Sequence, residues 1–333
     1  MQTVLQSLNG GLKRCFAQDE RVVLLGEDVL DPYGGAFKVT AGLSDSYPGR
    51  VWTTPISEAA IVGMATGMAL RGLLPVAEIM FGDFITLCAD QIVNHAAKFR
   101  GMYNDQVRVP LVVRTPMGGG RGYGPTHSQS LEKMFLGVPD LTVVAPSLAH
   151  DPGELLSHAV LEDEDPVLFI EHKLLYSMPL LTGGGTVRIR RVSEANGYDT
   201  VLLMNYAEGT PDVTLITYGG MSRLCAPLLE ELAEEEIRVL VALPSSLKPL
   251  PLETLAEAAA ESRRVVIAEE GTEGFNWGSE VASLLYDRLW GKLDRPITRL
   301  ATANSILPAA REMEAQALVS ADALRNALLE AAA

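Results

Sequence analysis

Glu58 is the residue of this sequence best placed to do acid–base chemistry. Pro55 ends an extended run, and Ser57 is a candidate N-cap for the apolar segment 59–70 that follows. We therefore expect Glu58 in the first turn of a helix, where the positive helix end favours a carboxylate. Because its neighbours are apolar, we expect it at the mouth of a buried site. A first-turn glutamate that only stabilises its own helix is the alternative.

A second candidate, His127, ends the glycine-rich loop 118–126. No GK[ST] follows this loop and its glycines do not have the G-x-G-x-x-G spacing, so it matches neither a P-loop nor the dinucleotide fingerprint. A flexible loop that delivers one imidazole is typical of an active-site lid. A capping or surface histidine is the alternative. The remaining histidines have no such context, and we assign them structural roles.

Alternating strand and helix patterns position these residues in the first half of the chain. Strand patterns lie at 21–26, near 51, and at 75–80, 109–114, 141–145 and 167–171, and helical patterns at 4–16, 58–70, 84–103 and 153–162. The alternation predicts a doubly wound α/β domain over residues 1–180. Glu27 directly follows the first strand, where open parallel sheets place their sites.

The alternation stops between residues 181 and 211, which contain three consecutive glycines, a basic run and polar turns. We predict that this segment is the interdomain connection. Strand patterns then resume at 213–218, 238–243, 265–269 and 297–301, with helical patterns at 221–235, 252–261, 278–289 and 320–332. Residues 212–333 are therefore predicted to form a second, smaller α/β domain.

The charge balance argues against nucleic acid as a partner. The 333 residues include 42 acidic and 27 basic side chains, for a formal net charge of −15. Such a surface suits a basic protein partner. Acidic runs at 230–231, 234–236 and 269–270 would concentrate this charge on the second domain. Solubility of a large oligomer is the alternative role of these acids.

The cysteines and the apolar segments bear on location. Cys15, Cys88 and Cys225 form no CxxC pair and no zinc spacing, and an odd, scattered set indicates the cytoplasm or another reducing compartment. Residues 1–9 lack the basic start and apolar core of a secretory signal. The apolar run 59–74 is interrupted by Arg71 and is too short to span a bilayer, so we expect a buried helix and no membrane.

Four short segments occur in the order typical of one family. They are Thr-Pro-Ile-Ser-Glu at 54–58, Met-Phe-Gly-Asp-Phe at 80–84, Asp-Gln-Ile-Val-Asn at 90–94 and Thr-His-Ser-Gln-Ser at 126–130. Together they resemble the β subunit of the thiamine-diphosphate-dependent 2-oxo acid dehydrogenases, within the transketolase-like superfamily. The resemblance covers nearly the whole chain. It implies a pyrimidine-binding domain at 1–180 and, at 212–333, a transketolase C-terminal-type domain that mainly supports subunit association.

The resemblance also implies roles for individual residues. Glu58 would contact the aminopyrimidine of the cofactor and move a proton there. Ile56, Met80 and Phe84 would grip the ring, Phe84 by offset stacking. For Ile56 and Met80, a place in the apolar core is an equal alternative. His127 would lie at the substrate end of the cofactor.

Other acidic residues receive implied roles with open alternatives. Glu27 is assigned to the cofactor site, and with Asp83, Asp90 and Glu58 it would form a proton path between paired active sites. Separate caps and solvated acids are the alternative.

The resemblance further implies a site for a monovalent cation such as K⁺. Its candidate ligands are Leu111, Val160, Leu161, Asp163 and Asp165. An ordinary acidic turn over 162–165 is the alternative.

One motif of thiamine enzymes is absent. No segment of the 333 residues fits the Gly-Asp-Gly…Asn pattern, whose oxygens hold Mg²⁺ and the diphosphate. We therefore expect Mg²⁺ and that half of thiamine diphosphate on an α-type partner in an α₂β₂ enzyme, which would pass its acyl group to the lipoyl-lysine of an acyltransferase core. Half of a split transketolase or acetoin-cleaving enzyme is the alternative, and a non-catalytic scaffold paralogue is another.

Overall fold

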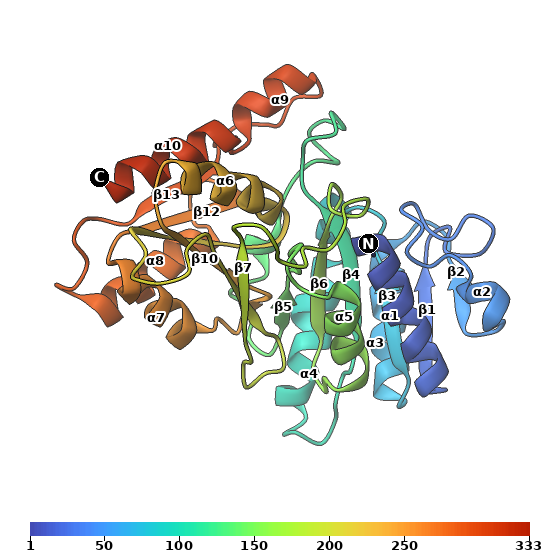
Figure 1. Ribbon diagram of the computed structural model, residues 1–333. Coiled ribbons are helices and arrows are strands. Elements are labelled where there is room, and N and C mark those ends of the chain that lie inside the picture. Colours follow the sequence, from blue (N-terminus) through green and yellow to red (C-terminus); the bar gives the residue numbers. More distant parts are fainter. The chain divides into compact units, whose positions relative to one another are not determined.

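The computed structural model describes residues 1–333, which fall into two units (Figure 1). Unit 1 consists of Met1–Met117, Met134–Val144 and Asp151–Leu180, and unit 2 of Gly118–Lys133, Ala145–His150 and Leu181–Ala333. Two short segments before residue 180 are therefore grouped with unit 2. Patterns of strand and helix along the chain could not indicate this, because they follow chain order and not tertiary contact.

Unit 1 is built on a parallel sheet with the strand order β5-β6-β4-β3-β1-β2. The strands are β1 (Val22–Gly26), β2 (Val51–Thr53), β3 (Leu74–Glu78), β4 (Val112–Met117), β5 (Thr142–Val144) and β6 (Val167–His172). Most of their residues are buried, as expected for parallel strands covered on both faces. The strand order reverses between β1 and β3, the kind of position where doubly wound sheets bind ligands.

The helices of unit 1 include α1 (Val4–Gln18), α2 (Leu43–Ser46), α3 (Glu58–Leu70), α4 (Ala97–Met102) and α5 (Pro152–Leu161). Thr3 and Gln6 form a reciprocal capping box at the start of α1. Helices α1 and α5 lie side by side (Figure 1). A Cβ on Gly11 would lie 2.4 Å from the carbonyl oxygen of Gly153, so this close approach requires glycine.

The prediction of one long helix over 84–103 is wrong. The segment forms a 3₁₀ helix, η1 (Gly82–Cys88), then a π-helical stretch, η2 (Gln91–Ala96), and only then α4. Ile85 and Cys88 are both buried and three residues apart, which fits a 3₁₀ turn. Both η1 and η2 pack against α3, so the change of helix type accompanies a tertiary contact that the local pattern does not show.

Unit 2 contains a second sheet, with the strand order β13-β12-β9-β10-β8-β7. Its strands are β7 (Arg188–Val192), β8 (Thr200–Met204), β9 (Val213–Thr217), β10 (Val239–Pro244), β12 (Val265–Thr272) and β13 (Thr298–Thr302), and β11 (Ser246–Lys248) is a further short strand. β9, β10, β12 and β13 are parallel neighbours, whereas β8 pairs antiparallel with both β10 and β7.

Strands β7 and β8 lie within the segment that we interpreted as a connection. Val201 and Leu203 of β8 are fully buried in the core of unit 2. β7 forms the edge of the sheet, and its basic side chains are at least partly exposed. Charged residues are common on edge strands because they prevent pairing with another chain. We did not predict β7 from the sequence because Ile189 is its one residue that packs against the core, so the strand has no apolar pattern.

Helices cover both faces of the second sheet. The helical elements that follow β9 are η4 (Gly219–Met221), α6 (Ser222–Glu234), α7 (Leu252–Ser262), α8 (Trp277–Leu289), α9 (Arg311–Ala317) and α10 (Ala321–Ala332). Figure 1 shows α6 and α10 on one face and α7 and α8 on the other. Two α/β units with parallel-rich sheets confirm the predicted fold class. None of the helices combines the length and the apolar character needed to cross a bilayer.

Candidate functional site

Glu27 and Glu58 lie at the carboxyl edge of the first sheet. Glu27 directly follows β1, and Glu58 is the first residue of α3, a few residues beyond the end of β2. The Glu58 side chain is buried, with the residue only 6% exposed, at the positive end of its helix. Ser57 occupies the N-cap position with an extended backbone, but its side chain makes no capping hydrogen bond. Glu58 therefore lies in the first turn of a helix and is buried, as expected, but the expected cap contact is absent; its role in a site stays a prediction.

Electrostatic coupling connects the two carboxylates. Burial raises the pKa of the Glu27 carboxyl, and the nearby charges of Glu58 and Asp28 raise it further. A carboxyl that retains its proton more readily than usual, next to a second carboxylate, is a candidate for proton exchange. Oε1 of Glu27 is also buried without a hydrogen-bond partner. An unsatisfied acceptor beside a second carboxylate fits a ligand that brings N–H donors and a ring nitrogen, as an aminopyrimidine does.

Segment η1 packs against α3 at this point. Burial raises the pKa of the Cys88 thiol to about 12, and the charge of Glu58 contributes to the rise. Cys88 therefore stays a neutral thiol. Because Cys88 belongs to η1, its interaction with the Glu58 charge places η1 near Glu58. All three cysteines are free and buried.

The structure separates the three predicted ring-gripping residues by exposure. Ile56 is 83% exposed, which makes a role in the core wrong for this residue. Met80 and Phe84 are half-buried. Phe84 contacts Phe81 edge to face at 6.1 Å between ring centroids, and Phe81 contacts Phe37 in the same way at 5.6 Å. Phe84 is thus held by other aromatic rings, as a stacking platform requires.

Of the four acids of the predicted proton path, Glu27 and Glu58 interact in unit 1. The groups that raise the pKa of Glu27, after burial, are Glu58 and Asp28. Asp83 is buried in η1, whereas Asp90 is exposed and accepts a hydrogen bond from Asn94. Asp90 fits the alternative, a solvated acid near a helix start.

A buried ionic cluster at the same sheet edge was not predicted. Arg114 of β4 donates to Glu171 of β6 at 2.7 Å, and it also pairs with Glu78 of β3. Tyr176 donates its hydroxyl to Glu171 at 2.6 Å, and its ring stacks on Phe37 at 5.2 Å. The cluster cross-links three neighbouring strands and connects to the aromatic rings beside Phe84. Charged residues inside apolar strand patterns were the sequence signal for it.

His127 belongs to unit 2, in the segment Gly118–Lys133. Its backbone N–H donates to Gly124 O at 3.3 Å, and its Nδ1 lies 3.1 Å from the Thr126 hydroxyl. The side chain is half-buried, between the exposed Thr126 and the buried Ser128. Unit 1 therefore brings together Glu27, Glu58 and η1, and His127 is presented by unit 2.

The acidic run 269–270 is buried. The prediction that these two residues contribute to the acidic surface of the second domain is therefore wrong. Glu269, at the carboxyl end of β12, is 2% exposed, and its Oε2 has no hydrogen-bond partner. Burial raises the pKa of Glu269 to about 8, against the hydrogen bond from Gly278 N, and the charge of Glu132 raises it further. Of the other acids, Glu231 and Glu235 pair with Arg325.

We expect Glu269 to make stability depend on pH. Its carboxyl binds a proton more tightly in the folded state than in the unfolded state. The free energy of unfolding therefore decreases as the pH rises from about 4.5 to about 8. Glu269→Gln should flatten this dependence, because an amide does not ionise. Thermal unfolding midpoints at pH 5 and pH 8 measure the effect. Glu280→Gln, at an exposed position of α8, is the control, and an equal drop in Glu269→Gln and wild type would contradict the assignment.

The predicted cation ligands lie at the opposite edge of the first sheet. Leu111 O accepts a hydrogen bond from Val167 N at 2.8 Å, and Asp165 pairs with Arg100. No three acidic, histidine or cysteine side chains are grouped to hold a metal ion. A cation here would therefore depend on carbonyl oxygens.

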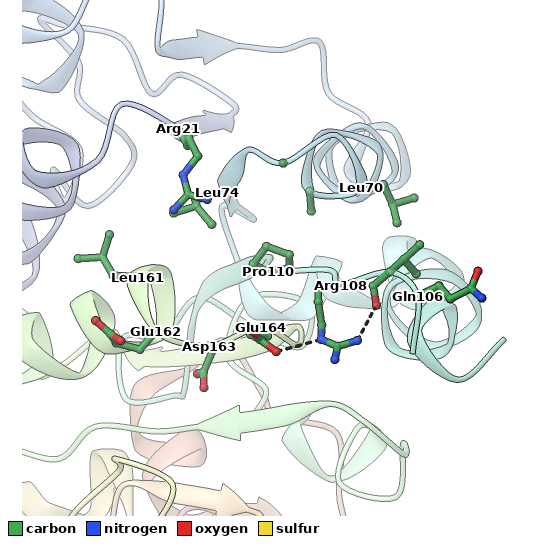
Figure 2. Close-up of a pocket in the computed structure, with 13 residues that line it drawn as sticks. Arg21, Leu70, Leu74, Gln106, Arg108, Pro110, Leu161, Glu162, Asp163 and Glu164 are labelled. Atoms are coloured by element: carbon green, nitrogen blue, oxygen red, sulfur yellow. Dashed lines mark hydrogen bonds and ion pairs between the residues drawn. The ribbon is translucent and has the colours of Figure 1, made fainter. Parts of the chain in front are cut away.

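Leu161 and Asp163 line a surface pocket of about 480 Å³ at the amino ends of the strands. Figure 2 shows Arg108 of this pocket, which donates to Glu164 at 2.9 Å. The Glu27–Glu58 pair lies at the other end of the strands, so this pocket is separate from it.

Comparison with known proteins agrees with the fold. Residues 2–179 match the family "Transketolase, pyrimidine binding domain", and residues 204–324 match "Transketolase, C-terminal domain". A split-gene transketolase, an inactive β4 tetramer, shares the fold with a TM-score of 0.74 at 19% identity, over 100% of this chain and 99% of that one. The two units are therefore those of a transketolase-like protein.

Two relatives of known name show to which group of transketolase-like proteins the chain is similar. The 2-oxoisovalerate dehydrogenase subunit beta of Bacillus subtilis is 37% identical over 100% of this chain and 99% of the relative. The acetoin:2,6-dichlorophenolindophenol oxidoreductase subunit beta of the same organism is 34% identical over 97% and 95%. The chain belongs to the thiamine-diphosphate-dependent, transketolase-like family that contains the β subunits of the 2-oxo acid dehydrogenases.

Proposed function

We propose that this chain is the β subunit of an α₂β₂ 2-oxo acid dehydrogenase that decarboxylates a 2-oxo acid and transfers the acyl group to lipoyl-lysine on an acyltransferase. The observation that carries the proposal is the buried, coupled pair of Glu27 and Glu58 at the carboxyl edge of a pyrimidine-binding-type sheet. The similarity to a 2-oxoisovalerate dehydrogenase subunit beta over the full chain supports it.

The site residues divide the work between binding and proton transfer. When bound, thiamine diphosphate supplies the nucleophilic carbon and the electron sink for decarboxylation. The buried Glu58 carboxyl would contact the ring nitrogen of the aminopyrimidine and move a proton there. Ile56, Met80 and Phe84 bind the ring faces. Glu27, whose carboxyl retains a proton more readily than usual, is the neighbouring proton reservoir.

His127 acts at the substrate end. Its imidazole has one ring nitrogen that can donate a hydrogen bond and one that can accept, so it would orient the reacting oxygen of the substrate. The loop that carries it has several glycines in the left-handed region of φ, which other residues rarely adopt.

An α-type partner would complete the site. The chain lacks the Gly-Asp-Gly…Asn segment, so the partner would hold Mg²⁺ and the diphosphate. Carbonyl oxygens near Leu111, Val160 and Leu161 would hold a K⁺ ion. The free, buried cysteines suit the cytoplasm or another reducing compartment.

An acetoin-cleaving enzyme is the second candidate function, favoured by the 34% identity to an acetoin oxidoreductase subunit beta. It would use the same pyrimidine site and differ in substrate and acceptor.

Reconstitution tests both functions. The chain, purified with an α-type partner, would be assayed with 2-oxoisovalerate, pyruvate and acetoin, using dichlorophenolindophenol or a lipoyl domain as acceptor. Turnover of a 2-oxo acid with acyl transfer to the lipoyl domain supports the first proposal. Turnover of acetoin alone supports the second. Transfer to a sugar aldehyde without a lipoyl domain would indicate a split transketolase, and an inactive complex would contradict all three.

A further inference from the structure

Two buried carboxylates of unit 2 hold the backbone of the loop that carries His127. Gly119 N donates to Glu270 Oε1 at 2.6 Å. Gly120 N donates to Glu314 Oε1 at 3.0 Å, and Gly122 N donates to Glu314 Oε2 at 2.8 Å. Glu314 is 1% exposed. A carboxylate that accepts from backbone N–H groups forms charge-assisted bonds, which are stronger than neutral ones.

The loop fits closely against the segment that contains α9. A Cβ on Gly119 would lie 3.0 Å from Leu318 Cδ1 and 3.2 Å from Glu314 Oε1. A Cβ on Gly122, whose φ is +70°, would lie 3.0 Å from Arg311 Cγ. Glycine at these positions therefore allows the backbone to reach the carboxylates. The two oxygens of Glu314 accept from the N–H groups on either side of Arg121. The backbone at Arg121 therefore cannot move away from Glu314 without breaking both hydrogen bonds.

The far end of the segment Gly118–Lys133, which contains the loop and His127, is also attached to the rest of unit 2. Lys133 Nζ donates to the carbonyl oxygens of Thr272 and Gly274, each at 3.0 Å. Tyr218 donates its hydroxyl to Glu132. Both ends are thus fixed, whereas Pro125 and Thr126, next to His127, are exposed. The conformation of the histidine segment depends on how its two ends are held.

We propose that Glu314 and Glu270 are positioning residues that fix the Gly118–Gly124 loop and thereby set the conformation in which His127 is presented. The carboxylates themselves do not touch the substrate. Unit 2 then contributes directly to catalysis, in addition to any role in subunit association. The link to catalysis rests on the proposed function of His127. The link between the carboxylates and the loop does not depend on it.

Limited proteolysis of the full chain tests the loop directly. Trypsin cleaves after Arg121, which lies between the two N–H groups that Glu314 binds. Cleavage requires this backbone to open, so we expect Glu314→Ala to raise the rate at Arg121 by about tenfold or more, because two charge-assisted bonds are lost. Mass spectrometry compares this rate with that at exposed Arg71 in unit 1.

Matched variants separate the loop from general instability. Glu312→Ala changes an exposed glutamate of the same helix and should leave the ratio of cleavage at Arg121 to Arg71 unchanged. Glu314→Gln keeps one carbonyl acceptor and should give an intermediate ratio. Glu270→Ala should also raise the ratio. If Glu314→Ala does not fold, Glu314→Gln compared with Glu312→Gln decides the question. An unchanged ratio in the Glu314 variants overturns the proposal.

Activity of the assembled enzyme provides the second measurement. Glu314→Ala should lower kcat more than it raises KM, since His127 remains present but is held in fewer productive conformations. If the loop opens and activity is unchanged while His127→Ala is inactive, the positioning role is wrong. If His127→Ala is fully active, the role proposed for His127 is wrong and the attachment of the loop still stands.

Discussion

Glu58→Gln should lower turnover of the assembled enzyme by about 10²–10⁴-fold, the usual scale for loss of a general acid–base group. Glutamine has nearly the same shape but cannot take up or release a proton. The residue is buried at the start of α3, beside Glu27 and η1, so the amide fits the same space. Folding and assembly should therefore be intact, and circular dichroism with size-exclusion chromatography checks this.

A matched variant shows whether the effect is specific to this position. Glu154 is also a first-turn glutamate in unit 1, but it is exposed at the start of α5. Glu154→Gln removes a comparable interaction with a helix end, worth about 0.3–1 kcal/mol, and should leave turnover unchanged. If the Glu58→Gln enzyme kept more than half of wild-type activity, Glu58 would be only a helix-stabilising residue.

The isolated chain should bind thiamine diphosphate weakly, and an α-type partner should increase the affinity by about 10²-fold or more. The sequence offers carboxylates and apolar residues for the pyrimidine but no segment for the diphosphate and Mg²⁺. A protein that lacks those ligands gains little from the charged half of the cofactor. Isothermal titration calorimetry of the chain, the partner and their mixture measures the difference.

Thiamine without its diphosphate is the matched control ligand. For the isolated chain, thiamine and thiamine diphosphate should bind with similar weak affinity, because only the ring is recognised. For the mixture, the diphosphate should add affinity that disappears when Mg²⁺ is removed. Tight, Mg²⁺-dependent binding to the isolated chain would show that it carries a complete site, contrary to the divided site that we propose.

Local sequence patterns were sufficient to predict an element where its own residues show which faces are buried. Continuous apolar runs such as 22–26 predicted parallel strands, because both faces of these strands are covered. The position of Glu58 at the start of a helix was predictable from local sequence too, because it is the single carboxylate directly before an apolar helical segment. The order of the four short motifs then indicated the family.

Other features depend on contacts between distant residues and could not be predicted. Glu270 was assigned only to an acidic run and Glu314 received no role, because nothing near them in the sequence indicates the glycine N–H groups that they bind. β7 was missed since an edge strand needs few apolar residues. The change from 3₁₀ to π helix after Gly82 depends on packing against α3, which helix propensity does not describe.

The separation of Glu314 from the loop it holds has a consequence for the order of synthesis. Gly120 and Glu314 are 194 residues apart in the chain. A ribosome adds about 5–20 residues per second, so Glu314 is made roughly 10–40 s after Gly120. During that interval the loop cannot reach its final conformation, whatever else has folded. A nascent chain that stops before Glu314 would keep the glycine loop but lack the carboxylate that accepts from Gly120 N and Gly122 N.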